Sequence, residues 1–160
     1  MIRKVRLQDS REITDIYNEY VLHSTATFET EELTDKEMKL RIADIVAIYP
    51  YFVYEADGKV AGYCYAHAWK ERAAYKQTLE TTVYLSPEYT GRGIGRLLMQ
   101  KLIEECRAEG YLVLIACITK ENEASRALHQ ELGFKQVSHF EKVGLKFGRL
   151  LDVLDYELIL

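Results

Sequence analysis

The chain has 160 residues, of which 48% are apolar and 29% charged, and its 21 basic and 25 acidic residues give a net charge of −4. This length predicts a single domain, residues 1–160, large enough to bury a core without disulfides or a structural metal. The scattered basic residues give no reason to expect a nucleic-acid partner. The chain also shows no apolar membrane span and no secretory signal at its start. We therefore expect a cytoplasmic globular protein.

The cysteines do not suggest a metal site or a disulfide framework. Cys64, Cys106 and Cys117 are odd in number and fit no metal-ligand spacing. The four histidines show no such spacing either, so we expect no bound metal. Reduced thiols are the ordinary state inside a cell, in agreement with the expected location.

The first half of the chain predicts one strand, two helices and three further strands. Asp9 with Glu12, and Thr34 with Glu37, are spaced as capping boxes that begin the two helices, and Pro50 ends the second. Apolar residues follow each box at helical spacing, whereas the strands are rich in β-branched and aromatic residues. The predicted elements cover residues 2–7, 10–21, 35–49, 51–55, 60–67 and 78–85.

The second half predicts a long helix, a buried strand, a short helix and two final strands. Gly110 and Gly133 stand where helices commonly end. The order β-α-α-β-β-β-α-β-α-β-β indicates an α/β protein with a central mixed sheet flanked by helices. These elements cover residues 93–109, 112–118, 122–131, 134–139 and 153–160.

A glycine-rich turn between a strand and a helix is the sharpest functional signal. The run Tyr89 to Arg96 reads YTGRGIGR. Glycines let the backbone approach a ligand, and the first amides of a helix favour an anion such as a phosphate. The run fits neither a Walker loop nor a dinucleotide fingerprint. The candidate phosphate-binding residues are Gly91, Arg92, Gly93, Ile94, Gly95 and Arg96.

The segment VYLSPEYTGRGIGRLL, residues 83–98, resembles the acetyl-CoA pyrophosphate loop of the GNAT family of N-acetyltransferases, with Thr90 in place of Gln or Arg. The spacing of residues 122–134 is similar to a second motif of that family, with His129 where many members carry Tyr. The resemblance implies the GNAT fold and acetyl-CoA as co-substrate. The cofactor-binding residues it implies are Val83, Tyr84, Leu85, Gly91, Arg92, Gly93, Ile94, Gly95, Arg96, Asn122 and Ser125.

Further segments of the chain resemble the phosphinothricin N-acetyltransferase branch of this family. Residues 69–84, WKERAAYKQTLETTVY, resemble its signature, and residues 24–28, STATF, resemble its substrate loop with Thr27 in place of Asn. Residues 144–153 resemble a third segment, although Leu145 and Leu150 replace aromatic residues. The branch implies a homodimer that acetylates the α-amine of a small amino acid such as phosphinothricin, methionine sulfoximine or methionine sulfone. The implied substrate-binding residues are Phe28, Lys70, Arg72 and Tyr75.

Acetyl transfer to an amine needs a group that accepts the ammonium proton. Strand alternation places Glu80 on a polar face with Thr78, Thr82 and Tyr84, and the general base of the branch aligns with Glu80. His129 lies one helical turn after Ser125 and is a second catalytic candidate, for the thiolate or a proton relay. Direct attack by the amine is the simpler route, since the cysteines have no base beside them in the sequence.

Two other functions remain open at this point. The acceptor is a different amine in the first, namely a polyamine, an aminoglycoside or a protein N-terminus. In the second, the chain is a non-catalytic sensor that only binds acyl-CoA. A sensor has no need of a buried base, so Glu80 separates the two classes.

Overall fold

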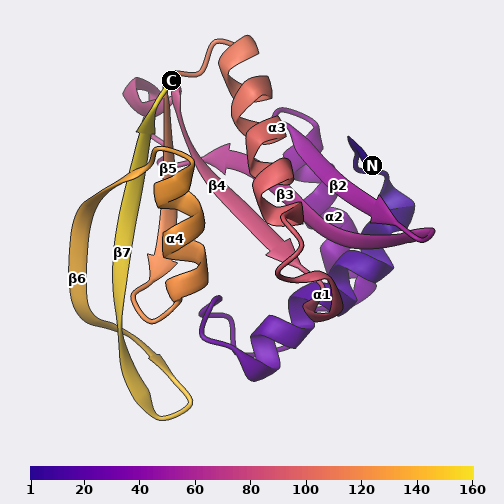
Figure 1. Ribbon diagram of the computed structural model, residues 1–160, viewed down its shortest axis with the longest axis horizontal. Helices are drawn as coiled ribbons and strands as arrows, with labels where there is room; N and C mark the ends of the chain where they lie inside the picture. Colours follow the sequence, from indigo (N-terminus) through magenta and orange to yellow (C-terminus); the bar gives the residue numbers. More distant parts are fainter.

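The computed structural model describes residues 1–160, which form a seven-stranded sheet and four α-helices (Figure 1). The helices are α1 (Ser10–His23), α2 (Asp35–Val46), α3 (Ile94–Ala108) and α4 (Glu123–Glu131). The strands are β1 (Ile2–Lys4), β2 (Tyr51–Ala56), β3 (Lys59–Ala68), β4 (Thr78–Leu85), β5 (Val113–Thr119), β6 (Lys135–Lys146) and β7 (Arg149–Ile159). Short 3₁₀ turns cover Leu7–Asp9, Ala73–Tyr75 and Pro87–Tyr89.

The strands lie in the order β1-β2-β3-β4-β5-β7-β6. Every neighbouring pair is antiparallel except β4 and β5, which are parallel. These two parallel strands pair only from Thr78 with Val113 to Glu80 with Ile115, although both continue well beyond that point. The sheet is therefore open between the far ends of β4 and β5.

Alternating side chains bury the two faces of the sheet against different helices. Leu98 and Leu102 of α3 are fully buried in one cluster, which receives Phe52 from β2. Ile13 of α1 and Ile42 of α2 are fully buried in the other cluster. Figure 1 shows α3 and α4 in front of the sheet. At roughly 25 cal/mol per Å² of apolar surface, these two clusters supply most of the driving force for folding.

One of the two expected capping boxes is present. Thr34 Oγ1 accepts from the Glu37 amide at 3.1 Å, and the Glu37 carboxylate accepts from the Thr34 amide at 2.7 Å. The box expected at Asp9 and Glu12 is wrong, because both carboxylates have tertiary partners. Asp9 accepts from Arg3 and from the Arg6 amide, and Glu12 accepts from the Val60 amide at 2.8 Å.

The last two strands are much longer than their sequence predicts. β6 and β7 form a hairpin that extends beyond the rest of the sheet (Figure 1), where strands were expected only at 134–139 and 153–160. Its tip turns at Phe147 and Gly148, both with positive φ, as in a tight two-residue hairpin turn. Most of the outer hairpin is exposed, so it lacks the alternation of buried side chains that identifies a strand. The first strand is correspondingly shorter than predicted, since it ends at Lys4.

None of the helices combines the length and the apolar character that crossing a membrane requires.

Candidate active site

A cleft of about 810 Å³ occupies the opening between β4 and β5. Every residue from Glu80 to Leu85 lines it, together with residues of β5, α4 and the turn before α3. Because β4 has no strand partner on this side beyond Glu80, its backbone groups there, apart from the Leu85 carbonyl that accepts from Tyr20, are free to bind an extended ligand. The cleft is thus a direct consequence of the sheet topology.

The glycine turn forms one end of the cleft. Gly91, Gly93 and Gly95 line it, and the first two have φ values of 74° and 79°, a left-handed conformation that glycine adopts without cost. Gly93 is the N-cap of α3 and its residue type supplies no side-chain cap, so the first amides of this 15-residue helix remain available to an anion. Beta carbons at Gly91 and Gly93 would meet nothing within 4 Å, which leaves open space beside the backbone.

The two arginines and Ile94 of the turn have different positions. Arg96 lines the cleft, and its guanidinium lies 3.7 Å from the Glu131 carboxylate, with both side chains more than half exposed. Arg92 does not line the cleft, because its guanidinium packs over the Tyr89 ring with 5.1 Å to the ring centroid. Ile94 is buried in the core, so only its backbone is available for the predicted contact.

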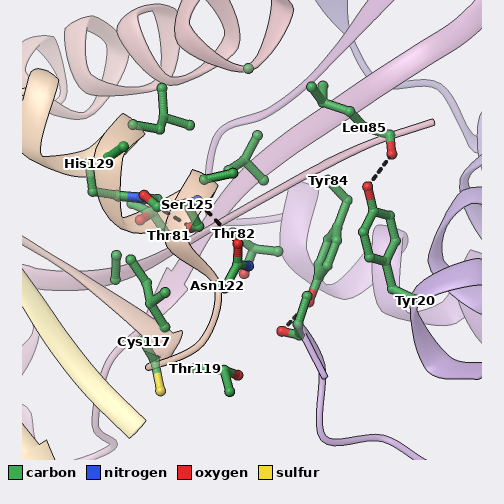
Figure 2. Close-up of a pocket in the computed structure, with 18 of the residues that line it drawn as sticks. Tyr20, Thr81, Thr82, Tyr84, Leu85, Cys117, Thr119, Asn122, Ser125 and His129 are labelled. Carbon is green, nitrogen blue, oxygen red and sulfur yellow. Dashed lines mark hydrogen bonds between the residues drawn. The ribbon is translucent and has the colours of Figure 1, made fainter. Parts of the chain in front are cut away.

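His129 and Asn122 come from α4 and its N-terminus (Figure 2). The Asn122 side chain accepts from the Ser125 amide at 3.1 Å and caps the helix. His129 is 3% exposed, and its Nδ1 lies 2.7 Å from the Ser125 carbonyl. Since a carbonyl only accepts, Nδ1 carries the proton and Nε2 presents a lone pair. Burial lowers the pKa of His129, so the ring is neutral near pH 7 and Nε2 is an acceptor.

Glu80 lies at the point where β4 and β5 separate, and its side chain is 31% exposed. It pairs across the sheet with His67 of β3, whose Nε2 lies 3.4 Å from Glu80 Oε2. The Ala68 carbonyl lies 2.9 Å from His67 Nδ1 and therefore fixes a proton there. The contact with Glu80 raises the pKa of His67. The histidine thus contacts one oxygen of a carboxylate that lines the cleft.

Polar residues missed by the sequence analysis also line the cleft. Thr81 is 7% exposed and its hydroxyl has no hydrogen-bond partner in the protein, which is unusual for a buried polar group. Tyr20 donates to the Leu85 carbonyl at 2.5 Å and fixes the end of β4 (Figure 2). Cys117 and Thr119 lie on the β5 side. Thr81 lies on the face of β4 opposite Glu80 and Thr82, and the sequence gives only one signal for it, a threonine between these two residues.

The segment that resembles a substrate loop contributes Phe28, a predicted substrate-binding residue, to the cleft. Phe28 lines the cleft with Ala26 and Thr27, and the Tyr84 hydroxyl donates to the Ala26 carbonyl at 3.4 Å.

Lys70, Arg72 and Tyr75, which are predicted to bind the substrate, lie on the β3–β4 connection and do not line the cleft. Their contact with the substrate stays a prediction. The Lys70 ammonium packs 4.4 Å from the Trp69 ring centroid and 5.7 Å from that of Tyr75, a cation–π arrangement that keeps it on its own loop.

Comparison with known proteins agrees with this geometry. Residues 13–134 match the acetyltransferase (GNAT) family. The chain belongs to the GNAT family. It is 42% identical to the phosphinothricin N-acetyltransferase of Alcaligenes faecalis over 96% of this chain and 79% of that protein. It is 38% identical to the L-methionine sulfoximine/L-methionine sulfone acetyltransferase of Salmonella typhimurium, over 95% of this chain and 90% of that protein.

A solved structure is similarly close to this acetyltransferase. The phosphinothricin acetyltransferase of Sinorhizobium meliloti in complex with AcCoA has a TM-score of 0.97 and 40% identity, covering 100% of this chain and 88% of that chain. The predicted fold, a GNAT sheet flanked by helices, is confirmed. No group of three or more His, Cys, Asp or Glu side chains is arranged to hold a metal.

Proposed function

We propose that this enzyme transfers the acetyl group of acetyl-CoA to the α-amine of a small amino acid such as phosphinothricin, methionine sulfoximine or methionine sulfone. The observation that carries the proposal is the single cleft that joins an unpaired strand edge, a free helix N-terminus and the Glu80 carboxylate. Relatives named for these acceptors match over nearly the whole chain.

Acetyl-CoA fits the cofactor half of the cleft. The amides after Gly93 suit its pyrophosphate, and Arg96 adds positive charge beside them. The free edge of β4 from Val83 to Leu85 suits the pantetheine arm as an extra strand. When bound, acetyl-CoA supplies the activated acetyl thioester.

Glu80 is the general base of the proposed reaction. It accepts one proton from the substrate ammonium, after which the amine nitrogen forms a bond to the acetyl carbon while the carbon–sulfur bond breaks. The nitrogen then loses its second proton, which the leaving thiolate takes up, so that the products are the amide and the free thiol of coenzyme A. A backbone amide of the free β4 edge is placed to polarise the carbonyl oxygen. His129, neutral with Nε2 as an acceptor, serves as a hydrogen-bond acceptor in the cleft rather than as the acid for the leaving thiolate.

Direct attack by the amine is favoured over a thioester on the enzyme. Cys117 is the cysteine that lines the cleft. Desolvation, together with the carboxylates of Asp155 and Glu80, raises the pKa of its thiol to about 12. Since the thiolate is the nucleophilic form, Cys117 stays protonated and unreactive near neutral pH.

Thiol release from acetyl-CoA, measured with a panel of amino acids, polyamines, aminoglycosides and N-terminal peptides, tests the proposal. We expect methionine sulfoximine, methionine sulfone or phosphinothricin to give the highest kcat/KM. Glu80→Gln keeps the shape of the side chain and should lower kcat by about 10²–10⁴-fold while acetyl-CoA affinity changes little. Thiol release with none of the amines, together with tight acetyl-CoA binding, would instead identify an acyl-CoA sensor.

We also propose that two copies of the chain associate through the β6–β7 hairpin. The hairpin carries five large apolar side chains that are each at least 51% exposed, namely Phe140, Val143, Leu145, Phe147 and Leu150, and its register pairs Leu145 with Leu150 on one face. An exposed apolar patch of this kind is typical of a protein interface. Light scattering after gel filtration should give twice the chain mass, and Leu145→Glu should give the monomer. A monomeric wild type at micromolar concentration refutes the dimer.

A further inference from the structure

One wall of the cleft is a segment without regular secondary structure that follows α1. Residues 24–28 line the cleft through Ala26, Thr27 and Phe28. Tyr84 donates to the Ala26 carbonyl, and Tyr84 alternates with Thr82 and Glu80 on one face of β4. This wall therefore lies on the face of β4 that carries Glu80, whereas Gly95, in the first turn of α3, lies near Leu85 on the other face. The wall belongs to the side where an acceptor amine meets Glu80.

Lys146 fastens this wall from more than 115 residues away in sequence. It ends β6, and its side chain is buried, with the residue 3% exposed. Its ammonium donates to the carbonyls of Tyr20, Ser24 and Thr27 at 3.2, 2.6 and 2.8 Å, which uses all three of its N–H donors. Burial lowers the pKa of Lys146, and the nearby Glu29 carboxylate opposes that effect. A surface lysine does not have such a set of acceptors.

Gly144, two residues earlier on the same strand, supports the Phe28 ring. A beta carbon at Gly144 would lie 2.3 Å from Phe28 Cε2 and 2.6 Å from Cζ. The backbone of Gly144 is not left-handed, so alanine is disfavoured here only by the ring. Because Phe28 lies between this strand and the cleft, the bare backbone of Gly144 sets how far the ring projects into the cleft.

Two further contacts hold the same segment. Thr119 donates to the Thr25 carbonyl at 2.7 Å, and the Tyr17 and Thr27 hydroxyls lie 2.8 Å apart. These bonds join the wall to β5 and α1, so the segment is attached on three sides. Among these contacts, only those from β6 reach both the Phe28 ring, through Gly144, and the two ends of the segment, through Lys146.

We propose that Gly144 and Lys146 are positioning residues that determine the shape of the acceptor pocket. Gly144 determines the position of the Phe28 ring, and Lys146 holds in place the backbone segment that carries this ring. This inference rests on the proposed function, because it assigns the Phe28 side of the cleft to the acceptor. It does not require either residue to touch the substrate.

Steady-state kinetics of Gly144→Ala test whether Gly144 positions the Phe28 ring. Moving the ring into the cleft should raise the KM for methionine sulfone by about tenfold, the cost of modest overpacking, while the KM for acetyl-CoA changes less than about twofold. In a Phe28→Ala background the same substitution should have no effect, since the clash is gone. Equal changes in both KM values, or a Gly144→Ala effect that persists without Phe28, refute the proposed role of Gly144.

Hydrogen–deuterium exchange of residues 24–29 tests whether Lys146 holds this segment in place, and it does not depend on enzyme activity. Lys146→Met should speed exchange of these amides by about tenfold or more, because three carbonyls lose a charged donor. Lys135→Met, at an exposed lysine of the same strand, is the matched control and should leave exchange unchanged. Unaltered exchange in Lys146→Met refutes the proposed role of Lys146. A wild type that acetylates no amino acid refutes the proposed function, whatever the exchange shows.

Discussion

The ion pair between His67 and Glu80 predicts a specific dependence of stability on pH. The atoms lie 3.4 Å apart, and the two side chains are 36% and 31% exposed, so solvent screens the pair to about 1 kcal/mol or less. The hydrogen bond to Glu80 raises the pKa of His67 above its ordinary 6.5. A group whose pKa is higher in the folded state stabilises the fold fully below its unfolded pKa and loses that contribution as pH rises.

Urea denaturation of wild type and His67→Asn, followed by circular dichroism between about pH 5.5 and pH 9, measures this contribution. The wild type should be more stable by up to about 1 kcal/mol at the acidic end, and the difference should vanish at the alkaline end. His23→Asn is the matched control, since His23 makes no ion pair at the end of α1. A difference that stays constant or grows with pH contradicts the assigned pairing.

Two other predictions concern the turn and the first strand. Gly93→Ala and Gly110→Ala both place alanine at a left-handed residue, with φ of 79° and 90°, and each should lower the free energy of unfolding by about 1–2 kcal/mol. Calorimetry should show about tenfold weaker acetyl-CoA binding for Gly93→Ala but not for Gly110→Ala, because only Gly93 lies at the proposed phosphate site. Asp9→Asn should destabilise the protein by about 2 kcal/mol at pH 7, because Arg3, with its side chain 16% exposed, loses one of its two carboxylate partners and keeps only Glu55. Although burial raises the pKa of Asp9, the bonds from Arg3 and Arg6 lower it below 3.8, so denaturation near pH 3 should show a smaller difference.

The sequence predicts best what neighbouring residues determine. The β4 strand, the glycine turn and the Thr34–Glu37 box depend on contacts within a few residues, and the structure has all three. The failures have tertiary causes. Asp9 is spaced for a cap but finds Arg3 on another element. Lys70 and Arg72 are suitable carboxylate ligands by type, yet the path of the β3–β4 connection, which no local pattern encodes, keeps them out of the cleft.

The same distinction explains why the sequence identifies the acetyl donor more sharply than the acceptor. In the proposed function, the donor half of the cleft is formed mainly by one continuous segment, from the free edge of β4 through Gly91 and Gly93 into α3, so a short motif describes most of it. The acceptor half depends on Phe28, which is held by Gly144 and Lys146 from the other end of the chain. Substitution of Phe28, Gly144 or Lys146 can therefore change the acceptor that the enzyme prefers, while the glycine turn and Glu80 stay the same. Relatives that share the donor motif but differ in the contacts at Gly144 are expected to differ in acceptor preference.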